Sequence, residues 1–68
     1  MIKSVVVLFM YEDLLNGELV SIKKYCEKFN ISTSTFYRYI SAIREYLWES
    51  KLKEVVYDVK KHGYKIVY

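Results

Sequence analysis

The residues from which catalytic and metal sites are built are scarce in this sequence. Its 68 residues include one cysteine, one histidine, two glycines and no proline. A single cysteine excludes an intramolecular disulfide, and one cysteine with one histidine is too few for a self-contained zinc site. Two glycines cannot build a loop that cradles phosphates, and no second group is placed to work with the histidine in acid–base chemistry. The sequence therefore predicts no metal, no cofactor, no small-molecule ligand and no enzymatic activity.

Long hydrophobic runs are also missing. The apolar run over residues 5–10 is far shorter than the ~20 residues that cross a bilayer, and no small-residue cleavage site follows it. The chain is therefore predicted to be cytoplasmic and to have no membrane segment. A hydrophobic fraction of 53% indicates a folded chain, and its length indicates one domain covering residues 1–68.

Positive charge is concentrated in the later part of the chain. The net charge is +3 and the isoelectric point is about 9.0. Residues 1–20 carry one lysine and three acids, whereas residues 21–68 carry ten basic and five acidic residues, a local net charge of +5. A polyanionic partner would therefore contact the second part.

The first predicted element is a helix over residues 3–15. Asn16-Gly17 would end it, because either residue can take the left-handed conformation. A strand is the competing interpretation, because residues 2 and 5–7 are β-branched. The predicted core stripe of the helix consists of Val7, Met10, Tyr11, Leu14 and Leu15.

An apolar row is predicted on the outer face of this helix. Ile2, Val5 and Phe9 fall there rather than on the core stripe. An exposed apolar row on a small protein is typical of a contact surface. We predict a homodimer contact at this row, together with Trp48. The alternative is that the N-terminus folds back over the row or frays.

A second helix is predicted over residues 22–29 and a third over residues 33–48. Ser21 and Ser32 are suitable N-caps, and Asn30 can adopt the left-handed conformation that ends the second helix. Two helices joined by a turn of about three residues indicate a helix-turn-helix, with the third helix in the recognition position.

The third helix has two different faces. The stripe that would face the core consists of Phe36, Ile40, Ile43 and Leu47. The opposite face is hydrogen-bonding and basic, and consists of Ser34, Tyr37, Arg38 and Ser41. No acidic residue occurs between residues 31 and 41, so this face suits phosphates and base edges. The alternative is a polar face that is merely solvated.

After a polar connection over residues 49–53, in which Leu52 can act as an anchor, the hydrophobic period becomes strand-like. Two alternating runs flank the turn Lys60-Lys61-His62-Gly63, where Gly63 is predicted to supply a positive φ. A hairpin is unstable alone, so four of its residues are predicted to pack onto the helices: Val55, Tyr57, Tyr64 and Ile66. The basic tip predicts a wing over residues 55–67 that reaches the phosphate backbone, the alternative being a solvated loop tip.

The order of these elements resembles that of a known family. Residues 31–40, Ile-Ser-Thr-Ser-Thr-Phe-Tyr-Arg-Tyr-Ile, resemble the Val-Ser-Arg-Arg-Thr-Ile-Tyr-Arg-Asp-Ile signature of DeoR-type and WYL-domain transcription regulators and of biotin ligase–repressors. Residues 43–45 are similar to the Leu-Arg-Glu that follows it, and residues 63–66 resemble the Gly-Tyr-Arg-Leu return of their wing.

The resemblance covers nearly the whole chain and implies a DNA-binding winged helix-turn-helix. It places Thr35, Tyr37 and Arg38 where that signature meets DNA. Thr33 and Ser34 stand where the family usually has arginines, which implies weaker phosphate binding or a different sequence preference. Tyr39 stands where the family has an acid, and the sequence indicates no partner for it.

These observations predict an α+β fold, a small winged helix-turn-helix of three helices followed by a two-stranded β-hairpin wing. The predicted function is transcriptional regulation by a homodimer that binds double-stranded DNA, with the third helix in the major groove and the wing on the flanking backbone. The size suggests a regulator from a phage or other mobile element. The predicted DNA-binding residues are Lys23, Lys24, Thr33, Ser34, Thr35, Tyr37, Arg38, Ser41, Lys60, Lys61, His62 and Lys65.

The alternative function is a protein-interaction module that keeps this fold and does not bind DNA. The absence of the two arginines, the eight tyrosines and the outer apolar row favour it, because tyrosine and tryptophan are enriched at protein interfaces.

Overall fold

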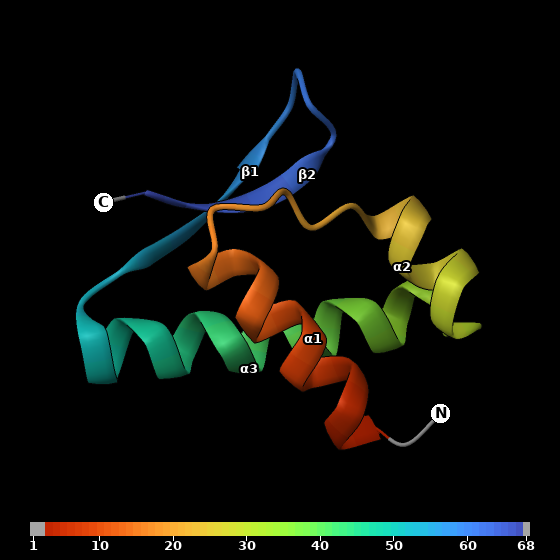
Figure 1. Ribbon diagram of the computed structural model, residues 1–68, viewed down its shortest axis with the longest axis horizontal. Coiled ribbons are helices and arrows are strands. Elements are labelled where there is room, and N and C mark those ends of the chain that lie inside the picture. Colours follow the sequence, from red (N-terminus) through yellow and green to blue (C-terminus); the bar gives the residue numbers. More distant parts are fainter. Residues whose placement is uncertain (1–2, 68) are drawn as a thin grey trace.

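Three helices and a β-hairpin follow one another along the chain. A computed structural model describes residues 3–67, with side chains for residues 5–67. The elements are α1 (Lys3–Leu15), α2 (Ile22–Phe29), α3 (Thr33–Lys51), β1 (Glu54–Asp58) and β2 (Gly63–Val67). Figure 1 shows α1 crossing α3, with α2 beside the N-terminal end of α3 and the hairpin projecting as a wing. The predicted winged helix-turn-helix architecture is confirmed. None of the described helices has the length and apolar content that a bilayer crossing requires.

The helices of the helix-turn-helix begin and end at the predicted residues. The Ser21 hydroxyl accepts the backbone N–H of Lys24 at 3.4 Å and caps α2. Asn30 is left-handed, with φ 53° and ψ 49°, and ends α2. The Ser32 hydroxyl accepts the backbone N–H of Thr35 at 3.1 Å and caps α3. Each cap satisfies a backbone donor that the helix itself leaves unpaired.

The first segment is helical over residues 3–15, so the competing strand interpretation is wrong there. Gly17 follows with φ 79°, as the stop signal predicted. The predicted core stripe is rotated, however. The innermost side chains are Val6, Met10 and Leu14, each at most 1% exposed. Because α1 contacts both α3 and β2, the side chains buried most deeply are those that face both of these elements.

The third helix continues past its predicted end at residue 48, to Lys51. Leu52 then adopts a left-handed conformation with φ 55°, and its backbone N–H donates to the carbonyls of Leu47 and Trp48. The predicted role of Leu52 as a packing anchor is wrong, because its side chain is 75% exposed. Leu52 ends the helix through its backbone rather than through its side chain.

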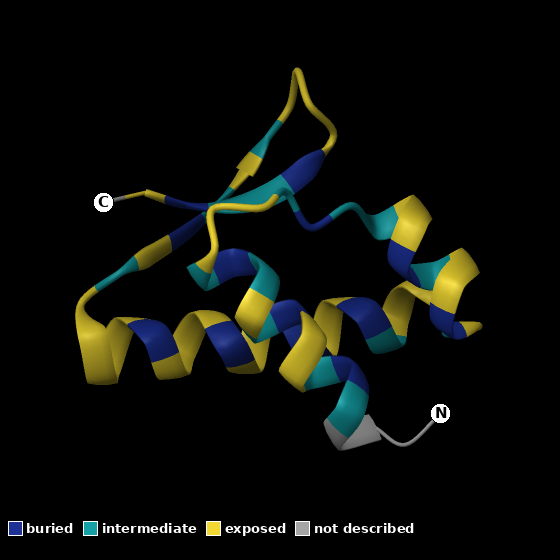
Figure 2. Ribbon diagram, in the orientation of Figure 1, coloured by how far each residue is buried: buried dark blue, intermediate teal, exposed yellow. Residues whose placement is uncertain are grey.

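The core is apolar, and every element contributes to it. No buried residue in the described part of the chain is polar or charged. Each turn of α3 has a buried side and an exposed side, so the helix has one face in the core and one open face (Figure 2). Tyr39 lies on the core side and is 9% exposed, so the aromatic ring without a predicted partner packs inside.

The wing is tied to the linker between α1 and α2. The strands β1 and β2 are antiparallel, with Val55 opposite Ile66 and Tyr57 opposite Tyr64. Val20 donates its N–H to the Tyr64 carbonyl at 2.9 Å and accepts the Tyr64 N–H at 2.8 Å. The linker is therefore joined to the hairpin by an isolated antiparallel β-bridge, which the sequence did not reveal.

Gly63 is required for a different reason from the one predicted. The positive φ of the turn belongs to His62, at 56°, and not to Gly63. A Cβ atom on Gly63 would lie 2.6 Å from Leu19 Cγ and 3.0 Å from the Val20 carbonyl oxygen. Gly63 therefore allows the close approach of the linker to β2, whereas His62 takes the left-handed turn position.

The hairpin packs onto the helices through three of the four predicted residues. Val55 and Ile66 are buried, and the half-buried Tyr64 packs against Phe36 at 6.0 Å between ring centroids. Tyr57 is the exception, because its side chain is 42% exposed. Its ring lies edge to face against the Tyr64 ring, with 5.1 Å between the ring centroids, and it faces outward.

Candidate nucleic-acid interface

The outer face of α3 presents the predicted recognition side chains. Five of the predicted residues are exposed along it: Thr33, Ser34, Tyr37, Arg38 and Ser41. Thr35 is half-buried, and its hydroxyl oxygen accepts a hydrogen bond from the Ser32 hydroxyl at 3.0 Å. Thr35 is therefore part of the N-terminal cap, and its own O–H remains available as a donor.

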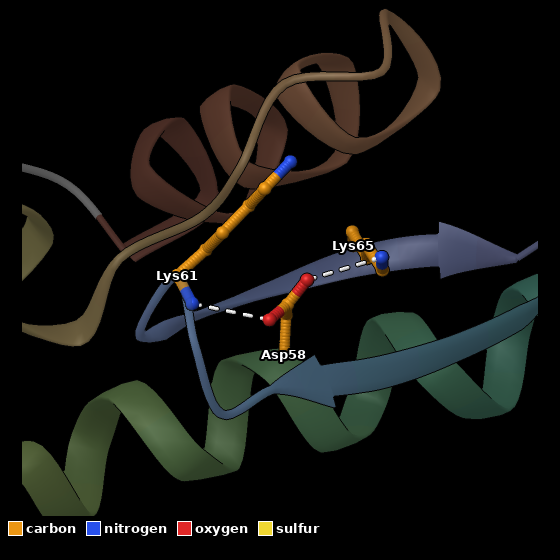
Figure 3. A network of polar contacts seen from close by, with 3 residues as sticks. All are labelled: Asp58, Lys61 and Lys65. Atoms are coloured by element: carbon orange, nitrogen blue, oxygen red, sulfur yellow. Dashed lines mark hydrogen bonds and ion pairs between the residues drawn. The ribbon is translucent and has the colours of Figure 1, made fainter.

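The tip of the wing presents the second predicted group of cations. Lys60, Lys61 and His62 are exposed in the turn between β1 and β2. Asp58 shapes this turn: its Oδ1 atom accepts the backbone N–H of Lys61 at 3.1 Å, and its Oδ2 atom lies 3.1 Å from Lys65 Nζ (Figure 3). The predicted contact residue Lys65 is thus partly neutralised by an ion pair within the wing.

These contacts also set the protonation of Asp58. The backbone N–H of Lys61, followed by the Lys65 ammonium group, holds the pKa of this carboxyl below its ordinary value. The carboxylate is therefore charged at neutral pH, and its hydrogen bond to the backbone of Lys61 holds the conformation of the turn.

An open groove of about 730 Å³ joins the helices to the wing. The predicted residues that line it come from three elements: Lys23, Lys24, Thr33, Lys61 and His62. The side chain of Glu18 also lines it and is the groove's acidic member. The other seven predicted residues lie outside this groove: Ser34, Thr35, Tyr37, Arg38, Ser41, Lys60 and Lys65. Cations from α2 and from the wing therefore surround the start of α3 on two sides.

Two residues on this side of the molecule were missed by sequence reasoning. Arg44 is exposed, and it lies seven residues after Tyr37 on α3, just under two turns, so the two share a face. Tyr57 lines the groove beside Lys61. Helical spacing could have identified Arg44, whereas strand alternation assigned Tyr57 to the core.

A second groove, of about 450 Å³, lies between the C-terminal half of α3 and β1. Its lining includes Ser41, Arg44 and Trp48. Trp48 is 58% exposed there. Glu45 and Glu54 line this groove as well, so the C-terminal half of α3 adds Arg44 and Trp48 to the outer face together with acidic neighbours.

Among the residues predicted for a dimer contact, the structure places Trp48 apart from Phe9, and the contact itself stays a prediction. Ile2 lies outside the described residues, and Val5 is half-buried. Phe9 packs against Phe29 of α2 at 5.6 Å between ring centroids, with the Lys28 ammonium 5.4 Å from the Phe9 centroid. Trp48 lines the groove beside β1, apart from that packing.

An open, mostly apolar groove lies between α1 and α3. A shallow groove of about 300 Å³ runs between the two helices, and Leu8, Tyr11, Ala42 and Tyr46 are among its lining residues. Leu8 is 62% exposed and Tyr46 is 54% exposed. Tyr46 follows Tyr37 by nine residues, about two and a half turns, so the two lie on opposite sides of α3, whereas Ala42 lies about one turn after Arg38 at the edge of the recognition face.

Comparison with known sequences adds one finding to this geometry. The family description that matches is "Mga helix-turn-helix domain", and the match covers residues 1–66. No curated protein and no solved structure matches the chain. The match supports a helix-turn-helix DNA-binding domain, as the resemblance implied. Membership of the DeoR-type, WYL-domain or biotin ligase–repressor families stays a prediction.

Proposed function

The chain belongs to the Mga helix-turn-helix domain family, and from this premise we propose that it is a transcriptional regulator acting in the cytoplasm on double-stranded DNA. The proposed mode has the N-terminal half of α3 in the major groove and the wing on the flanking backbone. One observation carries the proposal: the exposed hydroxyl and cationic face of α3 continues into a groove lined by lysines from α2 and from the wing. Origin in a phage or other mobile element also stays a prediction.

The residues divide into two proposed roles. Arg38 is exposed near the middle of the recognition face, and its guanidinium suits a guanine edge or a phosphate. Lys23 and Lys24 stand in the first turn of α2, where the helix dipole and their charges both favour phosphate. Lys60 and Lys61 would hold the wing on the adjacent backbone.

Fluorescence anisotropy with random-sequence duplex DNA tests this function, at low and at near-physiological salt. Wild-type binding should weaken steeply with salt, because phosphate contacts release counterions. Arg38→Ala should bind more weakly by about 1–3 kcal/mol if Arg38 contacts a base, or lower the salt slope by about 1 if it contacts a phosphate. Lys28→Ala is the matched control, because it removes one positive charge on the α1 side of α2. No wild-type binding at low salt would overturn the proposal.

We also propose that two copies pair through the α1–α3 groove and the adjoining side chains of Val5 and Phe9. One small domain makes few phosphate contacts, so two copies on two half-sites would bind more tightly. Tyr46 of the groove lies on the side of α3 opposite Tyr37, so pairing there leaves the Tyr37 side of each recognition helix open. In sedimentation velocity, Leu8→Asp should abolish association, whereas Leu52→Asp, which changes an exposed leucine outside the groove, should not.

Substitutions in this groove and on the recognition face also test the alternative function, a protein-interaction module that does not bind DNA. If the domain is a protein-interaction module, Arg38→Ala leaves its activity intact and Leu8→Asp abolishes it. If it binds DNA, Arg38→Ala weakens duplex binding and Leu8→Asp leaves the intrinsic affinity of each monomer unchanged.

A further inference from the structure

We propose that one DNA phosphate docks where the wing meets α3, on the guanidinium of Arg44 and the hydroxyls of Tyr37, Tyr57 and Tyr64. This inference rests on the proposed function and adds to it an anchor between the recognition helix and the wing tip. The four residues are called the tyrosine crook below. Of these four residues, only Tyr37 was predicted from the sequence to bind DNA.

The packing of the rings brings three phenols to this junction. Tyr57 and Tyr64 are paired across the hairpin, with ring centroids 5.1 Å apart. Phe36 is buried in the core, and its ring contacts those of both Tyr64 and Tyr37, with 6.0 Å between ring centroids in each case. A buried ring therefore fixes the wing and the recognition helix relative to each other.

The hydroxyls of these tyrosines are unused in the fold. Within residues 5–67, none of the three donates to or accepts from a protein group. Tyr37 is 48% exposed, so its donor is open to a ligand. Tyr64 is half-buried, and its pKa is raised by that burial, followed by the nearby Tyr37 hydroxyl. The hydroxyl of Tyr64 thus stays protonated at neutral pH and remains a donor.

Arg44 supplies the positive charge. It lies close enough to Tyr64 to oppose the rise in the pKa of that residue. Glu45 and Glu54 line the same groove as Arg44, yet Arg44 forms no ion pair with either in the described part of the chain. Its planar, always charged guanidinium suits the oxygens of a phosphate, and neighbouring hydroxyls can donate to the same group.

A phosphate fits this site better than a base edge does. The guanidinium only donates and each phenol can donate, which suits the acceptor oxygens of a phosphate, whereas base edges in the major groove present donors and acceptors in mixed patterns. A phosphate contact at this point would fix the register of α3 in the groove without reading sequence itself.

The test measures salt-dependent binding of the full domain to two unrelated duplexes. Arg44→Ala should weaken binding to both duplexes about equally, by about tenfold, and lower the salt slope by about 1. Tyr57→Phe keeps the ring and removes the hydroxyl, and should weaken binding by about 2- to 10-fold. Lys28→Ala is the matched control outside the tyrosine crook and should leave both quantities unchanged.

The outcomes separate this inference from the proposed function. If wild type binds with a steep salt slope and Arg44→Ala keeps that slope, the tyrosine crook is wrong and DNA binding stands. A loss confined to one duplex would also overturn it, because that result indicates base reading. If wild type binds neither duplex, the proposed function fails first. Thermal melting of each variant shows whether the fold is retained; if Arg44→Ala unfolds, Arg44→Lys and Tyr57→Phe carry the test.

Discussion

The two glycines illustrate how one residue type meets two structural needs. Gly17 has φ 79° with no atom within 4 Å of an added Cβ, so only its conformation matters. Gly63 has no positive φ, but an added Cβ would collide with Leu19 and with the Val20 carbonyl. From the sequence alone, both positions are simply glycines near a turn.

The substitution of asparagine at the two glycines should separate these needs. Gly17→Asn should cost less than about 1 kcal/mol of unfolding free energy, because asparagine tolerates the left-handed conformation. Gly63→Asn should cost about 1–3 kcal/mol, because the linker must move away from β2. Urea denaturation measures both, and equal losses would contradict the close-approach role of Gly63.

A second residue-scale feature is the hydrogen bond that Tyr25 of α2 donates to Asp13 of α1. Burial, followed by the Asp13 carboxylate, raises the pKa of Tyr25 above its ordinary value of 10.0. The folded state therefore holds this proton more tightly than the unfolded state does. The stabilisation is complete below pH 10 and is lost as the pH rises above it.

Tyr25→Phe should lower the unfolding free energy by about 1 kcal/mol at neutral pH, because it removes that bond. It should also make the fall in stability between pH 9 and about pH 11 shallower. Urea denaturation at several pH values checks both effects. Tyr46→Phe, which removes an exposed hydroxyl, is the control and should leave the pH dependence unchanged.

At the scale of elements, the start of α3 combines a structural and a binding role. Ser32 caps the helix, and Thr33 at the next position lines the groove beside Lys23 and Lys61. A substitution at the cap can therefore change folding and binding in different directions.

Two substitutions of Ser32 should separate these roles. Ser32→Ala should lower the unfolding free energy by about 0.5–2 kcal/mol through loss of the cap. Ser32→Asp should keep the stability, because aspartate caps equally well, and should weaken DNA binding by placing a carboxylate beside phosphates. Thermal melting and anisotropy on the same samples give the two readouts; unchanged binding by Ser32→Asp would place phosphates away from this end of α3.

The regular parts of these elements were predictable because their signals are local. The caps at Ser21 and Ser32 and the left-handed Asn30 follow from residue type and from the residues next in the chain. The end of α3 was predicted too early, because Leu52 stops the helix in a left-handed conformation that leucine rarely adopts. Arg44 could be placed on the outer face from helical spacing, but its neighbour Tyr64 lies twenty residues away in the sequence.

At the scale of the whole molecule, the placement of charge matters more than its sum. Glu18 lines the groove with Lys23, Lys24 and Lys61, whereas Glu12 lies exposed on α1. Both positions lie in the acidic first part of the chain, so sequence alone treats them alike. Only the fold brings Glu18 next to the cations of the second part.

Charge reversal at these two positions should distinguish local from net charge. Glu18→Lys and Glu12→Lys change the net charge equally, but Glu18→Lys should strengthen DNA binding more at low salt. The difference should shrink as salt shortens the screening length, which is ~10 Å at 0.1 M. Anisotropy across a salt series measures it; equal gains would mean that the groove does not face DNA.

The sequence by itself determined the order of the elements, the caps, the two faces of α3 and the basic character of the second part of the chain. These features depend on neighbours three or four positions apart, which residue type and periodicity report. The tertiary structure alone decided that Val20 pairs with Tyr64, that Gly63 accommodates Leu19, that Tyr57 faces outward and that Arg44 stands beside the wing. Each of these depends on the distance between segments far apart in the chain, and that distance is set by how α1, α3 and the hairpin pack around one core.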